Sequence, residues 1–367
     1  MRTIRRLIYK EVLASVVFVA VGFLALFFFF DFVDELPNVS RGANQYRLSQ
    51  ALAYVTLMIP SHLYELLPIA VLIGTIFVMA RLAQSSEYTI LRTSGLGPGR
   101  AMRTLLALGL IFTVLTFATG DYLAPASDRT AQLLKARLEG RISIGLTGAW
   151  LKERAPDRTY SVNVNALTPD GNMQGVRIFE ADRRGFIVTF MQAPKAQFAA
   201  DGAWLLHDAT VTRFPREVSA LARIEQQTLP AVRWHTEISP EMVSVALLKP
   251  DRMSTIDLFQ YIRHLEANQQ TSQRYEIEFW RKVFYPLSCM VMVVLALPFA
   301  YLHFRTRGIT GYVFVGVLIG ISFFLLNNVF GYIGNLQNWR PWLTAAAPGL
   351  IYTVLSLGAF GWLVLRR

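Results

Sequence analysis

The chain has 367 residues, of which 53% are hydrophobic and 17% are charged. Soluble domains carry about 25% charged residues, so this composition excludes an ordinary soluble globular protein and favours a membrane protein. The formal net charge of +11 does not indicate nucleic-acid binding, because the basic residues flank apolar segments. The single cysteine, Cys289, lies within an apolar run and excludes an intramolecular disulfide.

Six segments are long and apolar enough to cross roughly 30 Å of hydrocarbon as helices. They are residues 12–32, 54–82, 102–123, 283–302, 312–330 and 342–365. The first follows a basic start but precedes no small-x-small cleavage site, so we expect a retained helix rather than a cleaved signal peptide. The second contains Pro60, His62, Glu65 and Pro68 in its first half, which predicts a kinked or protein-sheltered outer end.

The orientation of these spans follows from the basic residues near their ends. With the N-terminus inside, the two short outer loops carry three arginines, which are Arg41, Arg47 and Arg340. The cytoplasmic ends carry twelve basic residues: Arg2, Arg5, Arg6, Lys10, Arg81, Arg92, Arg100, Arg103, Arg305, Arg307, Arg366 and Arg367. This excess predicts that both termini are cytoplasmic and that the long segment between the third and fourth spans is extracytoplasmic.

In the long extracytoplasmic segment, apolar and polar residues alternate with the two-residue period of β-strands. Tyr160, Val162 and Val164 alternate with polar residues, and clusters such as 168–172 and 182–185 supply turn residues. Successive short strands predict an all-β antiparallel sandwich or jelly roll. After it, residues 254–257 resemble a capping box that opens a helix leading back to the membrane.

The predicted organisation therefore has four parts. Residues 1–123 hold the first three transmembrane helices, 124–253 the β-jelly-roll domain, 254–281 a connecting helix, and 282–367 the last three transmembrane helices.

Motifs for catalysis and metal binding are absent from the sequence. There is no G-x-x-x-x-G-K-[ST], no H-E-x-x-H and no G-x-S-x-G. We therefore expect no ATPase site, no metal site and no cofactor in this chain. An intramembrane enzyme would need convergent acids or a nucleophile within the spans, and Glu65 alone is suggestive of one.

The first cytoplasmic loop predicts a short helix near residues 85–95. Ser85 or Ser86 can cap it, Glu87 favours its positive end, and Gly95 can terminate it. Tyr88 and Leu91 are expected to share a face with Glu87, so the helix either inserts into a groove of a soluble partner or serves as a simple connector.

The polar residues near and within the spans can each be interpreted in two ways. Lys135 and Arg137, like Arg41 and Arg47 in the first outer loop, either pair with phosphates of an anionic lipid or are solvated surface charges. Asn327-Asn328 in the fifth span marks a functional site or joins helices by hydrogen bonds.

Four motifs then occur in a characteristic order. Phe-Val-Asp-Glu-Leu stands at 32–36, Leu-Ala-Gln-Ser-Ser-Glu at 82–87 with Ser-Gly at 94–95, Leu-Ala-Pro at 123–125, and Phe-Trp-Arg-Lys-Val-Phe-Tyr-Pro-Leu-Ser at 279–288. In this order they resemble the LptF/LptG permease family of the lipopolysaccharide exporter across nearly the whole chain. The first and last motifs are more similar to the LptG branch.

The resemblance implies a transporter subunit without catalytic chemistry of its own. In that family two paralogous permeases form a heterodimer, here with an LptF-like partner, bound to a dimer of the ATPase LptB, which binds ATP and Mg. LptC-like and LptA-like proteins continue the path in the periplasm of Gram-negative bacteria. Lipopolysaccharide enters from the outer leaflet of the inner membrane through a gate between the first span of one permease and the fifth of the other.

The resemblance also assigns roles to residues. The family's coupling helix falls on residues 86–95, which implies that Glu87 anchors the ATPase and that Tyr88 and Leu91 pack into its groove, with Arg92 and Gly95 in the same segment. Family members carry basic residues where this chain has Pro37, Asn38 and Val39. The implied lipid-binding residues are therefore Lys135, Arg137, Arg41 and Arg47 for phosphates, and Leu26, Phe30, Phe323 and Leu326 for acyl chains.

A second function is compatible with the same topology. A mechanotransmission subunit carries the energy of ATP to the periplasm without moving a lipid through its helices. A transporter needs an apolar cavity between its helices, whereas a transmitter does not.

Overall fold

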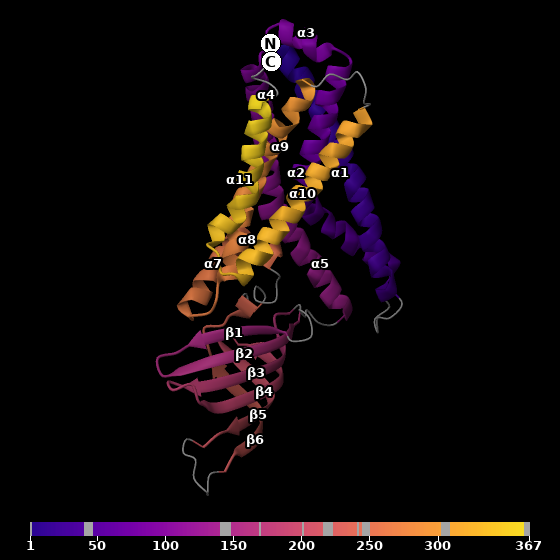
Figure 1. The fold of residues 1–367 in the computed structure, drawn as a ribbon. Coiled ribbons are helices and arrows are strands. Elements are labelled where there is room, and N and C mark those ends of the chain that lie inside the picture. Colours follow the sequence, from indigo (N-terminus) through magenta and orange to yellow (C-terminus); the bar gives the residue numbers. More distant parts are fainter. Residues whose placement is uncertain are drawn as a thin grey trace. The chain divides into compact units, whose positions relative to one another are not determined.

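The computed structural model describes residues 2–39, 47–139, 148–168, 170–199, 202–215, 223–240, 242–243, 250–301 and 309–362 (Figure 1). The chain forms two compact units. We call Met1–Glu35, Val55–Ser127 and Gln273–Arg367 the helical unit, and Leu36–Tyr54 with Asp128–Ser272 the sheet unit.

Long apolar helices dominate the helical unit. Their bounds are α1 (Arg2–Val39), α2 (Leu48–Gln84), α4 (Pro98–Ala118), α8 (Gln273–Phe284), α9 (Ser288–Ala296), α10 (Ile309–Leu336) and α11 (Pro341–Phe360), whereas α5 (Ala124–Glu139) lies mostly in the sheet unit. A short helix, α3 (Glu87–Thr93), joins α2 to α4. Pro98 and Pro341 open α4 and α11, where the missing N–H has no helical partner to lose.

The described residues contain six candidate spans, which confirms the predicted number. They are Ile4–Pro37, Leu48–Gln84, Pro98–Lys135, Gln273–Tyr301, Thr310–Leu336 and Pro341–Phe360. The third span continues through a π-helical turn (Thr119–Leu123) into α5, so helix extends beyond residue 124, where the sequence predicted the β-domain to begin. The fourth span begins at α8, because α8 continues through a 3-10 turn (Tyr285–Leu287) into α9; residues 273–281 are therefore not part of a separate connecting helix.

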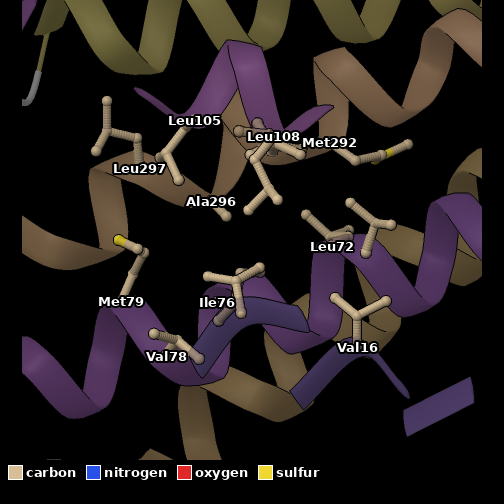
Figure 2. Packing of buried hydrophobic residues seen from close by; sticks show 14 of the residues in the cluster. Val16, Leu72, Ile76, Val78, Met79, Leu105, Leu108, Met292, Ala296 and Leu297 are labelled. Atoms are coloured by element: carbon tan, nitrogen blue, oxygen red, sulfur yellow. The ribbon is translucent and has the colours of Figure 1, made fainter. Parts of the chain in front are cut away.

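The core of the helical unit lies between α1, α2, α4 and α9. Figure 2 shows Val16, Ile76, Leu108 and Met292, one from each of these four helices, in the same buried cluster, and each is at most 3% exposed. Gly74 allows α1 and α2 to approach, since a Cβ there would lie 2.8 Å from the backbone nitrogen of Val16. Small residues at such crossings are typical of membrane helix packing.

Burial is uneven among the spans. In the most apolar window of α2, 83% of the residues are buried, whereas in those of α1 and α10 the share is 17% each. The inner half of α1 packs through Ile8, Val12 and Val16, but Leu26 and Phe30 further along are about half exposed. Two spans thus keep most of their apolar surface uncovered by this chain.

The sheet unit contains one antiparallel sheet of six described strands. They are β1 (Ala149–Arg154), β2 (Arg158–Leu167), β3 (Met173–Asp182), β4 (Ile187–Phe198), β5 (Ala203–Arg213) and β6 (Glu225–His235), paired in sequence order. Val162 and Val164 are fully buried, as the alternation predicts, and they pack with Ile178 and Trp204. A helical membrane protein with a β-domain inserted between its third and fourth spans is therefore confirmed.

The order of the strands is that of a meander. Tight turns with Gly171, Gly185 and Gly202 at φ between +78° and +85° return the chain directly beside the strand it has left. The described strands of the predicted all-β domain are therefore connected in sequence order, each hydrogen-bonded to the next.

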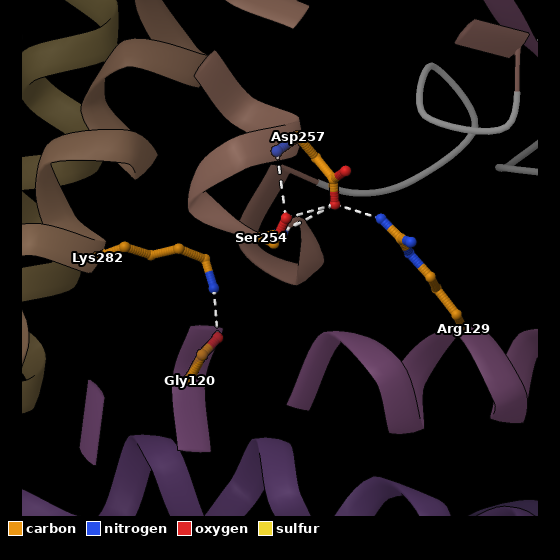
Figure 3. A network of polar contacts seen from close by, with 5 residues as sticks. All are labelled: Gly120, Arg129, Ser254, Asp257 and Lys282. Atoms are coloured by element: carbon orange, nitrogen blue, oxygen red, sulfur yellow. Dashed lines mark hydrogen bonds and ion pairs between the residues drawn. The ribbon is translucent and has the colours of Figure 1, made fainter. Parts of the chain in front are cut away.

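The helix α7 (Thr255–Ala267) follows the sheet and begins at the predicted capping box. The Asp257 N–H donates to Ser254 Oγ at 3.2 Å, and the Ser254 N–H donates to Asp257 Oδ2 at 3.2 Å. Arg129 forms an ion pair with the same carboxylate (Figure 3). At the other end of α7, the Arg154 N–H of β1 donates to Asn268 Oδ1 at 2.9 Å, so the helix is joined to the sheet.

Candidate functional site

The short helix α3 ends as the sequence predicts. Gly95 has φ +100°, its N–H donates to the Arg92 carbonyl at 3.1 Å, and the Leu96 N–H donates to the Leu91 carbonyl at 3.0 Å. This pair of bonds is a Schellman motif, which needs a left-handed residue that glycine provides without strain. Gly95 therefore fixes the end of α3.

The start of α3 differs from the prediction. Ser86 has φ 59° and makes no side-chain capping bond. The Ser85 hydroxyl instead donates to the Arg81 carbonyl at 3.1 Å and so completes the end of α2. Neither serine caps α3, because Ser85 belongs to the preceding helix and Ser86 forms the sharp turn between the two.

Tyr88 faces the interior of the helical unit. It is 3% exposed, its hydroxyl donates to the hydroxyl oxygen of Tyr301 at 3.1 Å, and the two ring centroids lie 5.2 Å apart. Burial, aided by this hydrogen bond, raises the pKa of Tyr88 well above its ordinary value. The expectation that Tyr88 packs into a partner's groove is therefore wrong. It anchors α3 to the end of the fourth span.

The outer surface of α3 carries Glu87 and Ile90. Glu87 is exposed, and Ile90, three residues later, is 62% exposed. Leu91 is half-buried against the core, and the Arg92 guanidinium lies 5.6 Å from the Tyr301 ring centroid. Ile90 was not among the predicted site residues, although its three-residue spacing from Glu87 places both on one face.

The basic residues assigned to lipid phosphates are only partly brought together. Lys135 Nζ lies 4.9 Å from the ring centroid of Tyr54. Arg47 is exposed, and its backbone N–H donates to Gln50 Oε1 at 2.9 Å. Arg41 and the side chain of Arg137 lie outside the described residues.

The apolar residues assigned to acyl chains divide into two kinds. Leu26 and Phe30 of α1 are 49% and 55% exposed. Phe323 is 2% exposed and packs between Tyr285 and Tyr352, with ring centroids 6.1 and 5.1 Å away, and Leu326 is half-buried against the same core. Phe323 is therefore a core residue and does not face acyl chains.

Polar groups within the spans join helices. Arg281 Nη2 donates to the backbone carbonyl of Asn327 at 2.8 Å and to Asn328 Oδ1 at 3.2 Å, so the side chain of Asn328 joins two helices by a hydrogen bond. Lys282, 6% exposed, donates to the Gly120 carbonyl at 2.8 Å in the π-helical turn (Figure 3).

The contacts near Glu65 bear on the hypothesis of an intramembrane enzyme. Tyr285 donates its hydroxyl to the backbone carbonyl of Glu65 at 2.5 Å, so this contact does not involve the Glu65 carboxylate. No group of three or more His, Cys, Asp or Glu residues in the described part of the chain is placed to hold a metal ion.

Comparison with known proteins identifies the family. The sequence model of the family described as "Lipopolysaccharide export system permease LptF/LptG" matches residues 6–366. The chain belongs to the LptF/LptG family. It is 25% identical over 368 residues to the lipopolysaccharide export system permease protein LptG of Haemophilus influenzae, covering 100% of this chain and 99% of that protein. LptG of Escherichia coli K12 is likewise 25% identical, over 99% of this chain and 98% of its own length.

These matches make the chain LptG-like along its whole length. The family is one of permeases, which agrees with a membrane subunit built from spanning helices. The motifs that suggested the family from the sequence are thus part of a similarity that covers both the helical unit and the sheet unit.

Proposed function

We propose that this chain is the LptG-like permease subunit of an ABC-type exporter. It extracts lipopolysaccharide from the outer leaflet of the inner membrane and passes it to a periplasmic bridge. The full-length similarity to LptG proteins supports the substrate, since their names state lipopolysaccharide export. The excess of basic residues at the predicted cytoplasmic ends supports the orientation, with both termini cytoplasmic and the sheet unit periplasmic.

The observation that carries the proposal is the uneven burial of the spans. A gate between the first span of one permease and the fifth of its LptF-like partner requires that both spans keep free apolar faces. In this chain α1 and α10 are the two spans with the smallest buried share, 17% each. Leu26 and Phe30 lie on the free part of α1, and Leu325 and Val329 on the free face of α10.

The energy enters through α3 in this proposal. An LptB-like ATPase dimer, which binds ATP and Mg, contacts the exposed Glu87 and Ile90. A push on α3 passes to the fourth span, because the Tyr88 hydroxyl and ring are held by Tyr301. The chain itself moves helices and makes or breaks no covalent bond. LptC-like and LptA-like proteins would receive the lipid after the sheet unit, with Lys135 near the route of its phosphates.

Site-specific photo-crosslinking tests the proposal. A photoreactive phenylalanine analogue replaces Phe30, which is 55% exposed on α1, or Leu350, which is 55% exposed on α11 and serves as the matched control. In the complete complex in lipopolysaccharide-containing vesicles, we expect an adduct with lipopolysaccharide at position 30 that declines when ATP is added. Position 350 should give ordinary phospholipid adducts.

Two results would contradict the proposal. Equal lipopolysaccharide labelling at both positions would mean that α1 faces the bilayer and not a transport path. Absence of labelling at position 30, while ATP hydrolysis still responds to the periplasmic partners, would favour the mechanotransmission subunit.

A further inference from the structure

A basic pocket lies at the end of the helical unit opposite the gate-forming part of α1. Its volume is about 330 Å³, and it opens between the first turns of α1 and the start of α4. Three arginines line it, Arg5, Arg100 and Arg103, together with the apolar residues Ile4, Ile8 and Leu96. The pocket thus combines a cationic rim with an apolar wall.

Local contacts hold the two sides of the pocket together. The Tyr9 hydroxyl of α1 donates to the Thr104 carbonyl of α4 at 3.1 Å, and Thr104 is part of the pocket wall. Arg100 Nη1 donates to the Gly95 carbonyl at 2.9 Å, and the Arg5 guanidinium lies 5.7 Å from the Tyr9 ring centroid. The apolar wall is well packed, since Ile8 and Leu96 are only 3% and 7% exposed.

Among the described residues that line the pocket, the charged groups are all cationic. All three charged residues in its lining are arginines, and no carboxylate of the described residues lines it. Arg81, by contrast, has its own partner in Glu11, with Nη2 and Oε2 2.6 Å apart. The positive end of the α4 dipole adds to the pocket's potential, because α4 begins at Pro98 and its Gly97 N-cap has no side chain to offer.

The chemistry of the lining selects an anionic amphiphile. Guanidinium groups bind phosphate oxygens through paired hydrogen bonds. An inorganic phosphate would gain nothing from the half-buried Ile4, whereas the glycerol and first methylenes of a phospholipid would cover it. Basic pockets between spanning helices on the cytoplasmic side are known to suit anionic lipid headgroups.

We propose that this pocket binds the phosphate of an anionic glycerophospholipid of the phosphatidylglycerol type. In the orientation proposed above, the lipid belongs to the cytoplasmic leaflet and is not the exported substrate. Bound there, it bridges α1 and α4 and holds the inner half of α1, while the outer half keeps its uncovered face. The site therefore adds a structural lipid to a chain whose transport path lies elsewhere.

Native mass spectrometry of the full-length protein tests this site. The protein, in a neutral detergent, is titrated with dioctanoyl phosphatidylglycerol, with dioctanoyl phosphatidylcholine as the zwitterionic arm and inorganic phosphate as the free-anion arm. We expect one phosphatidylglycerol adduct that forms at lower concentration than any phosphatidylcholine adduct. The double variant Arg5→Gln/Arg103→Gln should weaken it at least about fivefold, because two charge-assisted contacts are lost.

The control variant is Arg6→Gln, which removes an exposed charge from the same turn without touching the pocket. It should leave the adduct unchanged. Equal binding of phosphatidylglycerol by the double variant and by Arg6→Gln, or equal binding of phosphatidylcholine, would overturn the site. If inorganic phosphate saturates the site at the same concentration as phosphatidylglycerol, the pocket is a general anion site and the proposal of a bound lipid is refuted.

A photoreactive phosphatidylglycerol headgroup provides a measurement that needs no variant. It should label peptides containing Ile4–Ile8 and Leu96–Thr104 of the wild-type protein, and labelling confined to other peptides would also refute the proposal. Both measurements are independent of lipopolysaccharide export, so their failure would leave the proposed function standing.

Discussion

Phe30 and Phe323 are both aromatic residues within apolar spans, but their surroundings differ. Phe30 is 55% exposed on α1, whereas Phe323 is 2% exposed between the rings of Tyr285 and Tyr352. The sequence does not separate them, because a span that is apolar on all sides has no polar face to mark its orientation. Only the packing of α10 against its neighbours assigns the two phenylalanines to different roles.

Stability measurements should separate the two residues. Phe323→Ala leaves a cavity in the core, and we expect it to cost about 3–5 kcal/mol of unfolding free energy. Phe30→Ala should cost much less, since its ring leaves little packed volume behind. Heating followed by size-exclusion detection of the folded fraction measures both, and equal loss in the two variants would contradict the assignment of Phe323 to the core.

Lys282 gives a second test at the scale of single residues. Lys282→Met keeps the length of the side chain but leaves the Gly120 carbonyl without its 2.8 Å donor. We expect a loss of about 1–3 kcal/mol, as for a buried acceptor that loses its partner. Lys195→Met, an exposed lysine on β4, is the control and should be neutral in the same thermal assay. A neutral Lys282→Met would show that the bond to Gly120 contributes nothing.

The helix α3 shows which local features the sequence can predict. Its end was predicted because Gly95 must adopt φ +100° there, and glycine is readable from the sequence. Its start was not predicted, because the Ser85 hydroxyl donates to a carbonyl at the end of α2. Its inner face was not predicted either, because Tyr88 contacts Tyr301, more than two hundred positions away. Non-local contacts of this kind leave no local signal.

The two faces of α3 should respond differently to substitution. Glu87→Lys reverses an exposed charge, so we expect loss of copurification with the ATPase while the thermal stability of the chain is retained. Tyr88→Ala removes a buried ring and should lower stability by about 3–5 kcal/mol. If Glu87→Lys leaves both copurification and lipid-stimulated ATP hydrolysis intact, the docking role of Glu87 is wrong.

The helix α7 is expected to respond to pH through His264. Burial lowers the pKa of His264 below its ordinary value, despite opposing contributions from the nearby Glu153 and Glu237. Below the ordinary pKa of about 6.5, the unfolded chain therefore binds more protons than the folded one. The contribution of His264 to stability is complete above about pH 6.5. It is lost as the pH falls from there through the lower pKa of His264 in the folded protein.

Hydrogen exchange of α7 measures this effect. Between pH 7.5 and pH 5.5 the protection of α7 amides, corrected for the intrinsic pH dependence of exchange, should decline in the wild-type protein. His264→Phe should flatten the change. It sacrifices no bond of Nε2, which has no hydrogen-bond partner among the described residues, but it removes the 3.4 Å contact of Nδ1 with Asn268 Nδ2. An equal decline in both proteins would show that another group is responsible.

At the scale of the whole molecule, composition and charge placement were sufficient to predict six spans and an inserted β-domain. Hydropathy depends on residue type alone, so it identifies the spans wherever they pack. It does not show that α2 is covered by its neighbours and that α1 and α10 are not, because that difference arises from tertiary contacts. The gate between the first and fifth spans was implied by the family resemblance, and the structure adds that these two spans are the least covered by this chain.

Crosslinking through engineered cysteines tests the role of the uncovered spans. Cys289 is fully buried, so reagents should reach only introduced thiols. Leu325→Cys on α10 is expected to crosslink to a copurified LptF-like permease, and Leu350→Cys on α11 is not. Crosslinks from both positions, or between two copies of this chain alone, would contradict the proposed heterodimer.

The π-helical turn at Thr119–Leu123 has a consequence for how this chain can vary in length. Each residue advances an α-helix by about 100°, and a turn with i→i+5 bonds holds one residue more than an α-turn. Because the extra residue is taken up within the turn, deleting one residue there would restore regular α-helix and leave the later side chains of the same helix on nearly the same faces. A deletion in the regular part of α4, for example at the exposed Leu115, would instead rotate every later side chain by that angle, so the π-helical turn should tolerate the loss of one residue better than the rest of this span.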